Sequence, residues 1–244
     1  MSGIATLAAA ARTGVAGLVV ALFVFLTGPP GLIWALVTRR PGLLYALGAA
    51  GVRTGFVLAG IRLRIEGDEY IQRAGAVYAC NHSSNIEPPA VFLALRRVFP
   101  RLRVLYKAEL RKLPVLVWAF DMAGFVPIER ANKDQSWSAV DRAADALRAG
   151  NSFFIFPEGT RSRTGELLPF KKGGIVMALK AQAPIVPVAI TGARAAMRKG
   201  SPLIWPTTVT VTFLPPVATA GLGFDDRDLV IARVREAIAS RLTR

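Results

Sequence analysis

Cysteine and histidine are the scarcest chemically reactive residues in this 244-residue chain, with one of each. A single cysteine excludes an internal disulfide framework, because a disulfide needs two thiols. One cysteine and one histidine together exclude a zinc site made of Cys and His ligands. The lone thiol, Cys80, ends an apolar run, so we expect it to be a small buried residue. We therefore expect no protein-bound metal.

Acidic residues are also scarce, since 16 Asp and Glu stand against 31 Lys and Arg, for a net charge of +15. Such a balance favours anionic partners, namely nucleic acids, anionic lipid surfaces or phosphorylated substrates. The basic residues are scattered, without a recognition-helix, zinc-finger or RNA-binding signature around them. Hydrophobic residues make up 52% of the chain, which is high for a nucleic-acid binder and ordinary for a membrane-associated enzyme. We therefore expect anionic membrane lipids as partners and no nucleic acid.

Charged residues are absent between Arg12 and Arg39, and residues 42–60 are again mostly apolar. Taken whole, the first stretch is long enough to cross a hydrocarbon core of about 30 Å. A Gly-Pro-Pro-Gly segment at 28–31 predicts a break in it. This leaves two alternatives, one kinked spanning helix or two helices that dip into one leaflet. We interpret residues 1–60 as a hydrophobic helical membrane anchor, because no small-residue cleavage site typical of a signal peptide follows.

From Ile61 onward, predicted strands alternate with predicted helices. The segment 61–66 alternates apolar and polar residues, as a half-buried strand does. Further strands are expected at 76–80, 103–106, 125–128, 152–156, 185–190 and 208–213. Helices are expected at 88–98, around Trp118, at 134–149, at 173–182 and after 225–228. This order is typical of an α/β fold with a mostly parallel sheet flanked by helices, so we expect a second domain at 61–244.

The only histidine, His82, lies five residues before a carboxylate, in the segment Asn-His-Ser-Ser-Asn-Ile-Glu-Pro. An imidazole takes up a proton near neutral pH, and a nearby acid fixes its tautomer and stabilises the cation. An isolated histidine is more often a core or surface residue, but His82 follows a predicted buried strand and precedes a predicted helix. α/β folds carry their chemistry at such strand ends. We therefore predict that His82 is a general base and that Glu87 orients it.

A second polar segment, Phe-Pro-Glu-Gly-Thr-Arg at 156–161, also follows a predicted strand. It combines a guanidinium with backbone N–H groups, both of which suit an anion. A base together with an anion site indicates an enzyme that activates the hydroxyl of a phosphorylated acceptor. The chain has no Gly-x-Ser-x-Gly segment, which argues against a serine esterase or lipase. It also has no P-loop.

Four blocks of this sequence, in the same order, resemble the 1-acylglycerol-3-phosphate acyltransferases (lysophosphatidic acid acyltransferases) of the glycerolipid acyltransferase family. The family's N-H-x4-D-P block is matched by residues 81–88, with Glu87 in place of the usual aspartate. The F-P-E-G-T-R block is matched without change by 156–161. Also matched are G-x-x-x-[IV]-x-R by 124–130, an apolar stretch with a central proline by 185–188, and K-x-E-L by 107–110.

The resemblance implies a glycerol-3-phosphate acyltransferase-like α/β fold. It also implies transfer of a fatty acyl group from a thioester, acyl-CoA or acyl carrier protein, to the free hydroxyl of 1-acylglycerol-3-phosphate (lysophosphatidic acid). Phosphatidic acid is the product, and no cofactor is implied beyond the thioester co-substrate. The residues that it implies bind the phosphate or shape its pocket are Arg130, Arg161, Lys107, Glu158, Gly159 and Thr160. Backbone N–H groups near Gly159 are expected to hold the oxyanion.

More than one acceptor lipid is compatible with the sequence, because Glu87 stands where the family usually has aspartate. Glutamate has a longer side chain than aspartate and must fold back to reach the same imidazole nitrogen, and the related lipid A secondary acyltransferases accept it there. Alternative functions are acylation of another lysolipid, such as lyso-ornithine lipid or a remodelled lysophospholipid, and non-catalytic binding of anionic lipids. Arginine is denser after the apolar stretch than before it, so we expect a catalytic domain on the cytoplasmic face of the cell membrane.

Overall fold

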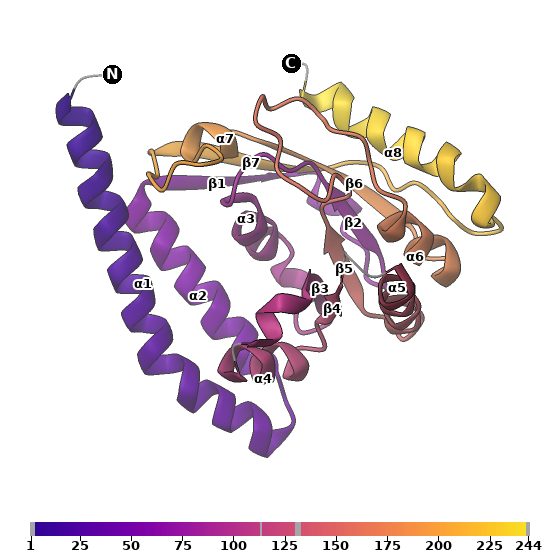
Figure 1. The fold of residues 1–244 in the computed structure, drawn as a ribbon, viewed down its shortest axis with the longest axis horizontal. Coiled ribbons are helices and arrows are strands. Elements are labelled where there is room, and N and C mark those ends of the chain that lie inside the picture. The colour runs from indigo at the N-terminus through magenta and orange to yellow at the C-terminus, as the bar shows by residue number, and fades with distance from the viewer. Residues whose placement is uncertain (1–2, 113, 130–132, 243–244) are drawn as a thin grey trace.

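The computed structural model describes residues 3–112, 114–129 and 133–242. A seven-stranded sheet forms its centre, with helices on both faces and two long N-terminal helices along one side (Figure 1). The strand order is β1-β7-β6-β2-β5-β3-β4. The strands are β1 Ile61–Glu66, β2 Val77–Cys80, β3 Leu102–Lys107, β4 Val126–Ile128, β5 Ser152–Ile155, β6 Ile185–Thr191 and β7 Thr207–Phe213.

Helices cover both faces of the sheet, and each face has its own apolar core. The helices are α1 Gly3–Thr38, α2 Gly42–Ala59, α3 Glu87–Ala94, α4 Pro114–Met122, α5 Lys133–Arg148, α6 Gly173–Ala181, α7 Ala193–Ala196 and α8 Arg227–Leu242. Short 3-10 turns are η1 Asp68–Tyr70, η2 Arg96–Val98, η3 Ala108–Lys112 and η4 Phe224–Asp226. The predicted fold class, a mostly parallel sheet flanked by helices, is confirmed.

Strand direction brings the predicted functional segments to one edge of the sheet. The neighbouring pairs among β6, β2, β5, β3 and β4 are all parallel, so these strands end at the same edge. β7 pairs antiparallel with β6 and parallel with β1, so β1 and β7 run the other way. The segments that follow β2, β5, β3 and β4 therefore emerge together, as the carboxyl edge of an α/β sheet requires for a site.

Two predicted helices differ in detail from the structure. The helix expected at 88–98 ends at Ala94 and gives way to η2. In α5, the spacing of Trp137, Val140, Ala144 and Leu147 predicts one apolar face, but Trp137 is 42% exposed. Its ring lies 6.3 Å from that of Phe224. The 3.6-residue period therefore located the helix, while the edge of its buried face depended on a neighbour distant in the chain.

Of the two alternatives left open at Gly28–Gly31, the structure has the continuous, kinked helix, because α1 runs through this segment. Pro29 and Pro30 lie inside the helix, and they remove two backbone donors without ending it. Figure 1 shows α1 bent in its lower part, as expected at proline. Gly31 allows close packing on α2, since a Cβ there would come within 2.6 Å of the Leu47 side chain. The chain reverses after Thr38 instead, and α1 and α2 form a helical hairpin.

The hairpin packs against the rest of the chain through Tyr45 of α2, which is buried. Its hydroxyl donates to the carbonyl of Leu102, and its ring centroid lies 4.8 Å from that of Phe99. Phe92 stacks on the same ring at 6.0 Å. The boundary proposed at residue 60 stays a prediction, but α2 shares an apolar core with the α/β segment.

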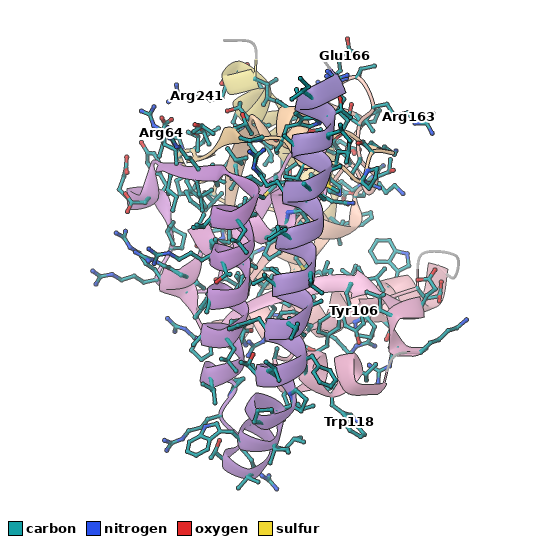
Figure 2. The ribbon with its side chains drawn as sticks, turned by 90° about the vertical axis from the view of Figure 1, so that its left-hand side faces the viewer. Arg64, Tyr106, Trp118, Arg163, Glu166 and Arg241 are labelled. Carbon is teal, nitrogen blue, oxygen red and sulfur yellow. The ribbon has the colours of Figure 1, made fainter. Side chains whose placement is uncertain are left out.

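The outer face of α1 is exposed and apolar (Figure 2). Both α1 and α2 are long and apolar enough to cross a membrane, judged by length and composition alone. The exposed large hydrophobic residues of α1 are Ile4, Leu7, Val15, Leu18, Val19, Leu22, Val24, Phe25, Leu26, Ile33, Trp34, Leu36 and Val37. An apolar surface of this extent indicates a contact with lipid or with another apolar partner.

Candidate active site

The structure places His82 and Glu87 in direct contact. His82 follows β2, and Glu87 is the first residue of α3. Nδ1 of His82 lies 2.7 Å from Oε2 of Glu87. An ionised carboxylate only accepts hydrogen bonds, so the proton is on Nδ1 and Nε2 keeps its lone pair. The pair thus has the arrangement of a general base and the acid that orients it.

The carboxylate of Glu87 is fully buried and is held by several donors. The backbone N–H of Ser83 donates to both of its oxygens, at 2.8 and 3.0 Å, and the Ser83 hydroxyl donates at 2.7 Å. These bonds compensate for burial of the charge. Ser84 acts as a turn residue, because its hydroxyl accepts the N–H of Ile86 at 3.2 Å.

Residues from two other strand ends fix the position of His82. The ring of Phe156 stacks on the imidazole, with 4.1 Å between centroids and 23° between planes. The N–H of Ser162 donates to the His82 carbonyl at 2.7 Å. Asn81 exchanges two hydrogen bonds with the backbone of Ile190 in β6. This role of Phe156 was not predicted from the sequence. The signal available was its place directly after a strand.

Glu158 points inward rather than toward solvent, and it is 3% exposed. Its Oε1 accepts the backbone N–H of His82 at 2.6 Å, and its Oε2 accepts that of Leu168 at 3.0 Å. Burial raises the pKa of Glu158, while these two N–H groups act in the opposite direction. The side chain therefore joins the loop that carries His82 to the loop that follows Phe156–Arg161.

The turn at Gly159–Arg161 lies among basic side chains. Gly159 has a φ of +69°, which glycine adopts without strain. A Cβ at this position would come within 2.8 Å of the Lys171 side chain. Nζ of Lys199 donates to the Arg161 carbonyl at 2.7 Å and lies 3.4 Å from the Thr160 hydroxyl. The turn thus has two lysine side chains close to it, which suits an anion.

The N–H of Gly159 is not the donor best placed for an oxyanion. The N–H of Gly159 donates to the Phe156 carbonyl at 3.0 Å, so it is already engaged. In the described part of the chain, no backbone partner is recorded for the N–H groups of Thr160 and Arg161. These two donors remain for a negatively charged oxygen.

Two predicted phosphate ligands are placed less closely. Lys107 ends β3, at the same sheet edge as His82. Arg130 lies outside the described residues, two positions after the end of β4. The phosphate-binding roles of Lys107, Arg130 and Arg161 therefore stay predictions.

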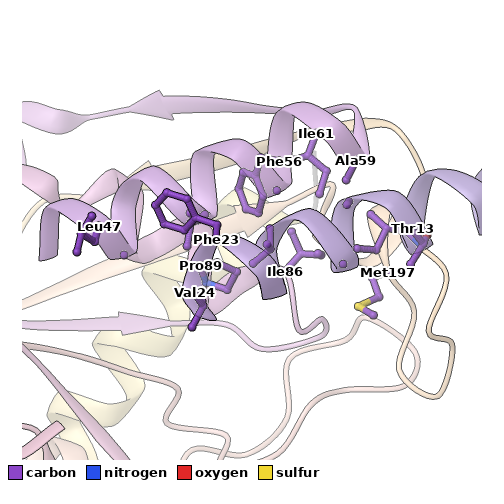
Figure 3. Close-up of a pocket in the computed structure, with 18 of the residues that line it drawn as sticks. Thr13, Phe23, Val24, Leu47, Phe56, Ala59, Ile61, Ile86, Pro89 and Met197 are labelled. Carbon is purple, nitrogen blue, oxygen red and sulfur yellow. The ribbon is translucent and has the colours of Figure 1, made fainter. Parts of the chain in front are cut away.

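An apolar cavity of about 650 Å³ lies between the hairpin and the α/β segment (Figure 3). Phe23 and Val24 of α1 and Phe56 of α2 contribute to its walls. It extends to Ile86 and Pro89, which lie on either side of Glu87 in the sequence. The volume is within the range of about 300–1,000 Å³ typical of small-molecule sites.

The fold and the histidine–carboxylate pair, in which Glu87 is buried and His82 partly buried, define an α/β protein with the arrangement of a general base at the carboxyl edge of its sheet. The family described as Acyltransferase matches residues 62–191, and the chain belongs to this family. The resemblance recognised in the sequence blocks is thereby confirmed.

Curated relatives include several named 1-acyl-sn-glycerol-3-phosphate acyltransferase. One from Limnanthes douglasii is 34% identical over 184 residues, which cover 75% of this chain and 64% of the relative. Another, from Cocos nucifera, is 36% identical over 163 residues, 66% of this chain and 52% of the relative. The chain thus matches roughly half to two thirds of the length of these relatives.

A solved structure shares the fold along almost the whole chain. The crystal structure of the 1-acyl-sn-glycerophosphate (LPA) acyltransferase, PlsC, from Thermotoga maritima matches with a TM-score of 0.82. The match covers 98% of both chains at 23% sequence identity. At this identity the likeness shows the fold, including the N-terminal hairpin.

Proposed function

We propose that this chain transfers a fatty acyl group from a thioester to the free hydroxyl of 1-acylglycerol-3-phosphate, which gives phosphatidic acid. The contact of 2.7 Å between His82 and Glu87 carries the proposal, because it leaves Nε2 free to accept the hydroxyl proton. The names of the curated relatives support this acceptor. The basic turn at Gly159–Arg161 supports an acceptor with a phosphate.

The proposed reaction is a direct transfer. The acceptor oxygen attacks the thioester carbonyl carbon while Nε2 of His82 takes its proton, and Glu87 stabilises the imidazolium. The tetrahedral intermediate then collapses, the carbon–sulfur bond breaks, and the imidazolium returns the proton to the departing thiolate. A general base typically contributes about 10²–10⁴ in rate. The N–H groups of Thr160 and Arg161 are the proposed donors to the oxyanion.

The acyl chains of the substrates explain the apolar parts of the molecule. We assign the 650 Å³ cavity beside Ile86 and Pro89 to an acyl chain, because its lining is almost wholly apolar and begins next to Glu87. The outer face of α1 attaches the chain to the membrane that holds the lysolipid. The net charge of +15 adds attraction to anionic lipids. The donor, acyl-CoA or acyl carrier protein, is taken from the cytoplasm.

The test is an acceptor panel with the full-length protein in phospholipid vesicles. Lysophosphatidic acid, a zwitterionic lysophospholipid and lyso-ornithine lipid are each offered with acyl-CoA and with acyl carrier protein. Release of free thiol and the mass of the lipid product are measured. We expect thiol release that depends on lysophosphatidic acid and stops in His82→Ala. A preference for lyso-ornithine lipid would show that this lipid, and not lysophosphatidic acid, is the acceptor. If thiol release depends on no acceptor, the protein binds lipid without acylating it.

A further inference from the structure

The carboxylate of Glu158 binds backbone N–H groups of two loops, and no hydrogen bond or ion pair joins it to a described basic side chain. Each of its oxygens has one partner, the N–H of His82 on Oε1 and the N–H of Leu168 on Oε2. Both partners are backbone donors, and the side chain is buried. A residue that bound the acceptor's phosphate would have to face that anion, which a buried carboxylate repels.

A carboxylate has two acceptor oxygens and satisfies both of these donors. Glutamine has almost the same shape, but it offers one acceptor oxygen and one NH₂ group. In place of Glu158, its NH₂ would face an N–H of His82 or Leu168. One buried donor would then lose its partner, and its loop would shift. Two donors bound to two oxygens therefore explain why a glutamate, rather than another polar residue, fits this position.

The main chain of His82 is held at both ends by the segment that begins at Glu158. Its N–H donates to Glu158, and its carbonyl accepts the N–H of Ser162. The side chain is held separately by Glu87 and by stacking on Phe156. Loss of the Glu158 bond would free the backbone of the base while its orienting acid stayed in place. A displacement of about 1 Å in a reacting group can cost roughly 10² in rate.

We propose that Glu158 is a positioning residue that fixes the backbone of His82, and that it makes no contact with the acceptor's phosphate. The kinetic test of this role rests on the proposed function. It replaces the role implied by the family resemblance, in which Glu158 shaped the phosphate pocket.

The test compares Glu158→Gln with Glu166→Gln in the full-length protein. Glu166 is a matched control, because it lies in the following loop, is exposed and loses the same charge. For Glu158→Gln we expect kcat to fall roughly 10–100-fold with the acceptor KM unchanged. Glu166→Gln should keep both constants. Glu158→Asp keeps two acceptor oxygens and should recover part of the lost kcat.

Amide hydrogen exchange gives a readout that does not depend on activity. In Glu158→Gln the peptides that cover 80–87 should exchange faster, while those of the far-face helix α8 should not change. A raised acceptor KM with normal kcat would overturn the proposal, and so would unchanged exchange around His82. Inactive wild-type protein would count against the proposed function alone, since the exchange result still decides the role of Glu158.

A different observation concerns Lys171, whose side chain crosses the turn at Gly159. The position that a Cβ of Gly159 would take lies 3.0 Å from the Lys171 ammonium nitrogen. Within the described part of the chain this ammonium has no recorded hydrogen-bond or ion-pair partner. Its neighbour Lys172 instead lies 3.5 Å from the carboxylate of Asp228. An unpaired cation over a turn that also carries Arg161 suits a phosphate monoester.

We infer that Lys171 binds the acceptor's phosphate, a role that again rests on the proposed function. Lys171→Gln and Lys172→Gln are compared on lysophosphatidic acid and on monoacylglycerol, which has the same hydroxyl and no phosphate. We expect the preference for lysophosphatidic acid in kcat/KM to fall about 10-fold in Lys171→Gln only, because a charge-assisted bond is lost. Binding to lysophosphatidic acid in vesicles, measured without a thioester so that no acyl transfer takes place, should also weaken in Lys171→Gln only.

The outcomes of this test distinguish the role of Lys171 from the proposed function. Equal losses on both acceptors, or equal losses in both lysine variants, would overturn the role of Lys171. If wild-type protein acylates neither acceptor, the proposed function fails. Binding without thioester then still tests the lysine, and unchanged binding in Lys171→Gln would sink it.

Discussion

Oε2 of Glu87 lies 2.7 Å from Nδ1 of His82, although the side chain is one methylene longer than the aspartate usual in this family. The extra length is accommodated because Glu87 opens α3 and folds back over the preceding turn. There the backbone and hydroxyl of Ser83 hold its carboxylate. Glutamate at this position is thus compatible with an oriented base, and it does not by itself imply a different acceptor.

His82→Ala should abolish acyl transfer while the protein stays folded and bound to vesicles. No second histidine exists to replace the base. Loss of a general base should lower the rate about 10²–10⁴-fold. Thiol release is the measurement, and a thermal melt checks the fold. Activity within a few-fold of wild type would remove His82 from the mechanism.

Glu87→Gln should lower kcat nearly as much as His82→Ala, roughly 10²–10⁴-fold. The amide can present NH₂ to Nδ1, which would favour the wrong tautomer and take the lone pair from Nε2. It also leaves fewer acceptors for the two donors of Ser83. Glu87→Asp should keep more activity than Glu87→Gln, because it retains the charge. Equal activity of Gln and wild type would show that the carboxylate does not orient the base.

The sequence predicted the strands, the sheet class and the two polar segments, because period and turn residues are local properties. It could not predict that β2 and β5 are neighbours, which is what stacks Phe156 on His82. The inward direction of Glu158 also depended on that pairing. The choice between a kink and a complete break at Gly28–Gly31 also lay outside the local signal of two prolines, since Gly31 packs on α2, which is not part of that local pattern.

Arg161→Ala and Arg130→Ala should each raise the acceptor KM, with smaller effects on kcat. Arginine suits a phosphate through its planar fork, so Arg161→Lys should recover only part of the loss. Removal of a charge-assisted bond corresponds to about 1.5–3 kcal/mol, or roughly 10–100-fold. Initial rates over a range of lysophosphatidic acid concentrations give the constants. An unchanged KM in both alanine variants would place the anion site elsewhere.

Alkaline solution should destabilise the protein through Tyr78. Burial raises the pKa of Tyr78 to about 12, although the N–H of Gln72 bound to its hydroxyl opposes this. The folded pKa is above the unfolded value of about 10, so stability present below pH ~10 is lost as pH rises toward ~12. The linked loss is roughly 2–3 kcal/mol. The free energy of unfolding, measured in urea at increasing pH, should therefore fall more steeply with pH in wild type than in Tyr78→Phe. Equal slopes in the two proteins would contradict the prediction.

Truncation at Ile61 is a poor test of membrane attachment, because it would uncover the core that Tyr45 shares with Phe92 and Phe99. Substitutions on the outer face of α1 avoid this problem. Leu18 and Phe25 are 65% and 75% exposed there. Leu229 of α8 is a matched control, 49% exposed and on the opposite side of the sheet.

The double variant Leu18→Ser and Phe25→Ser should be washed from vesicles by high salt, whereas wild type and Leu229→Ser should stay bound. Each buried apolar side chain contributes about 1.5–3 kcal/mol, and salt does not screen this part. The attraction of the +15 charge to anionic lipids is screened within about 10 Å at 0.1 M salt. Sedimentation with vesicles of anionic and of neutral lipid measures both parts. Release of wild type by salt would show that electrostatics alone hold the protein, and α1 would then lose its assignment as the anchor.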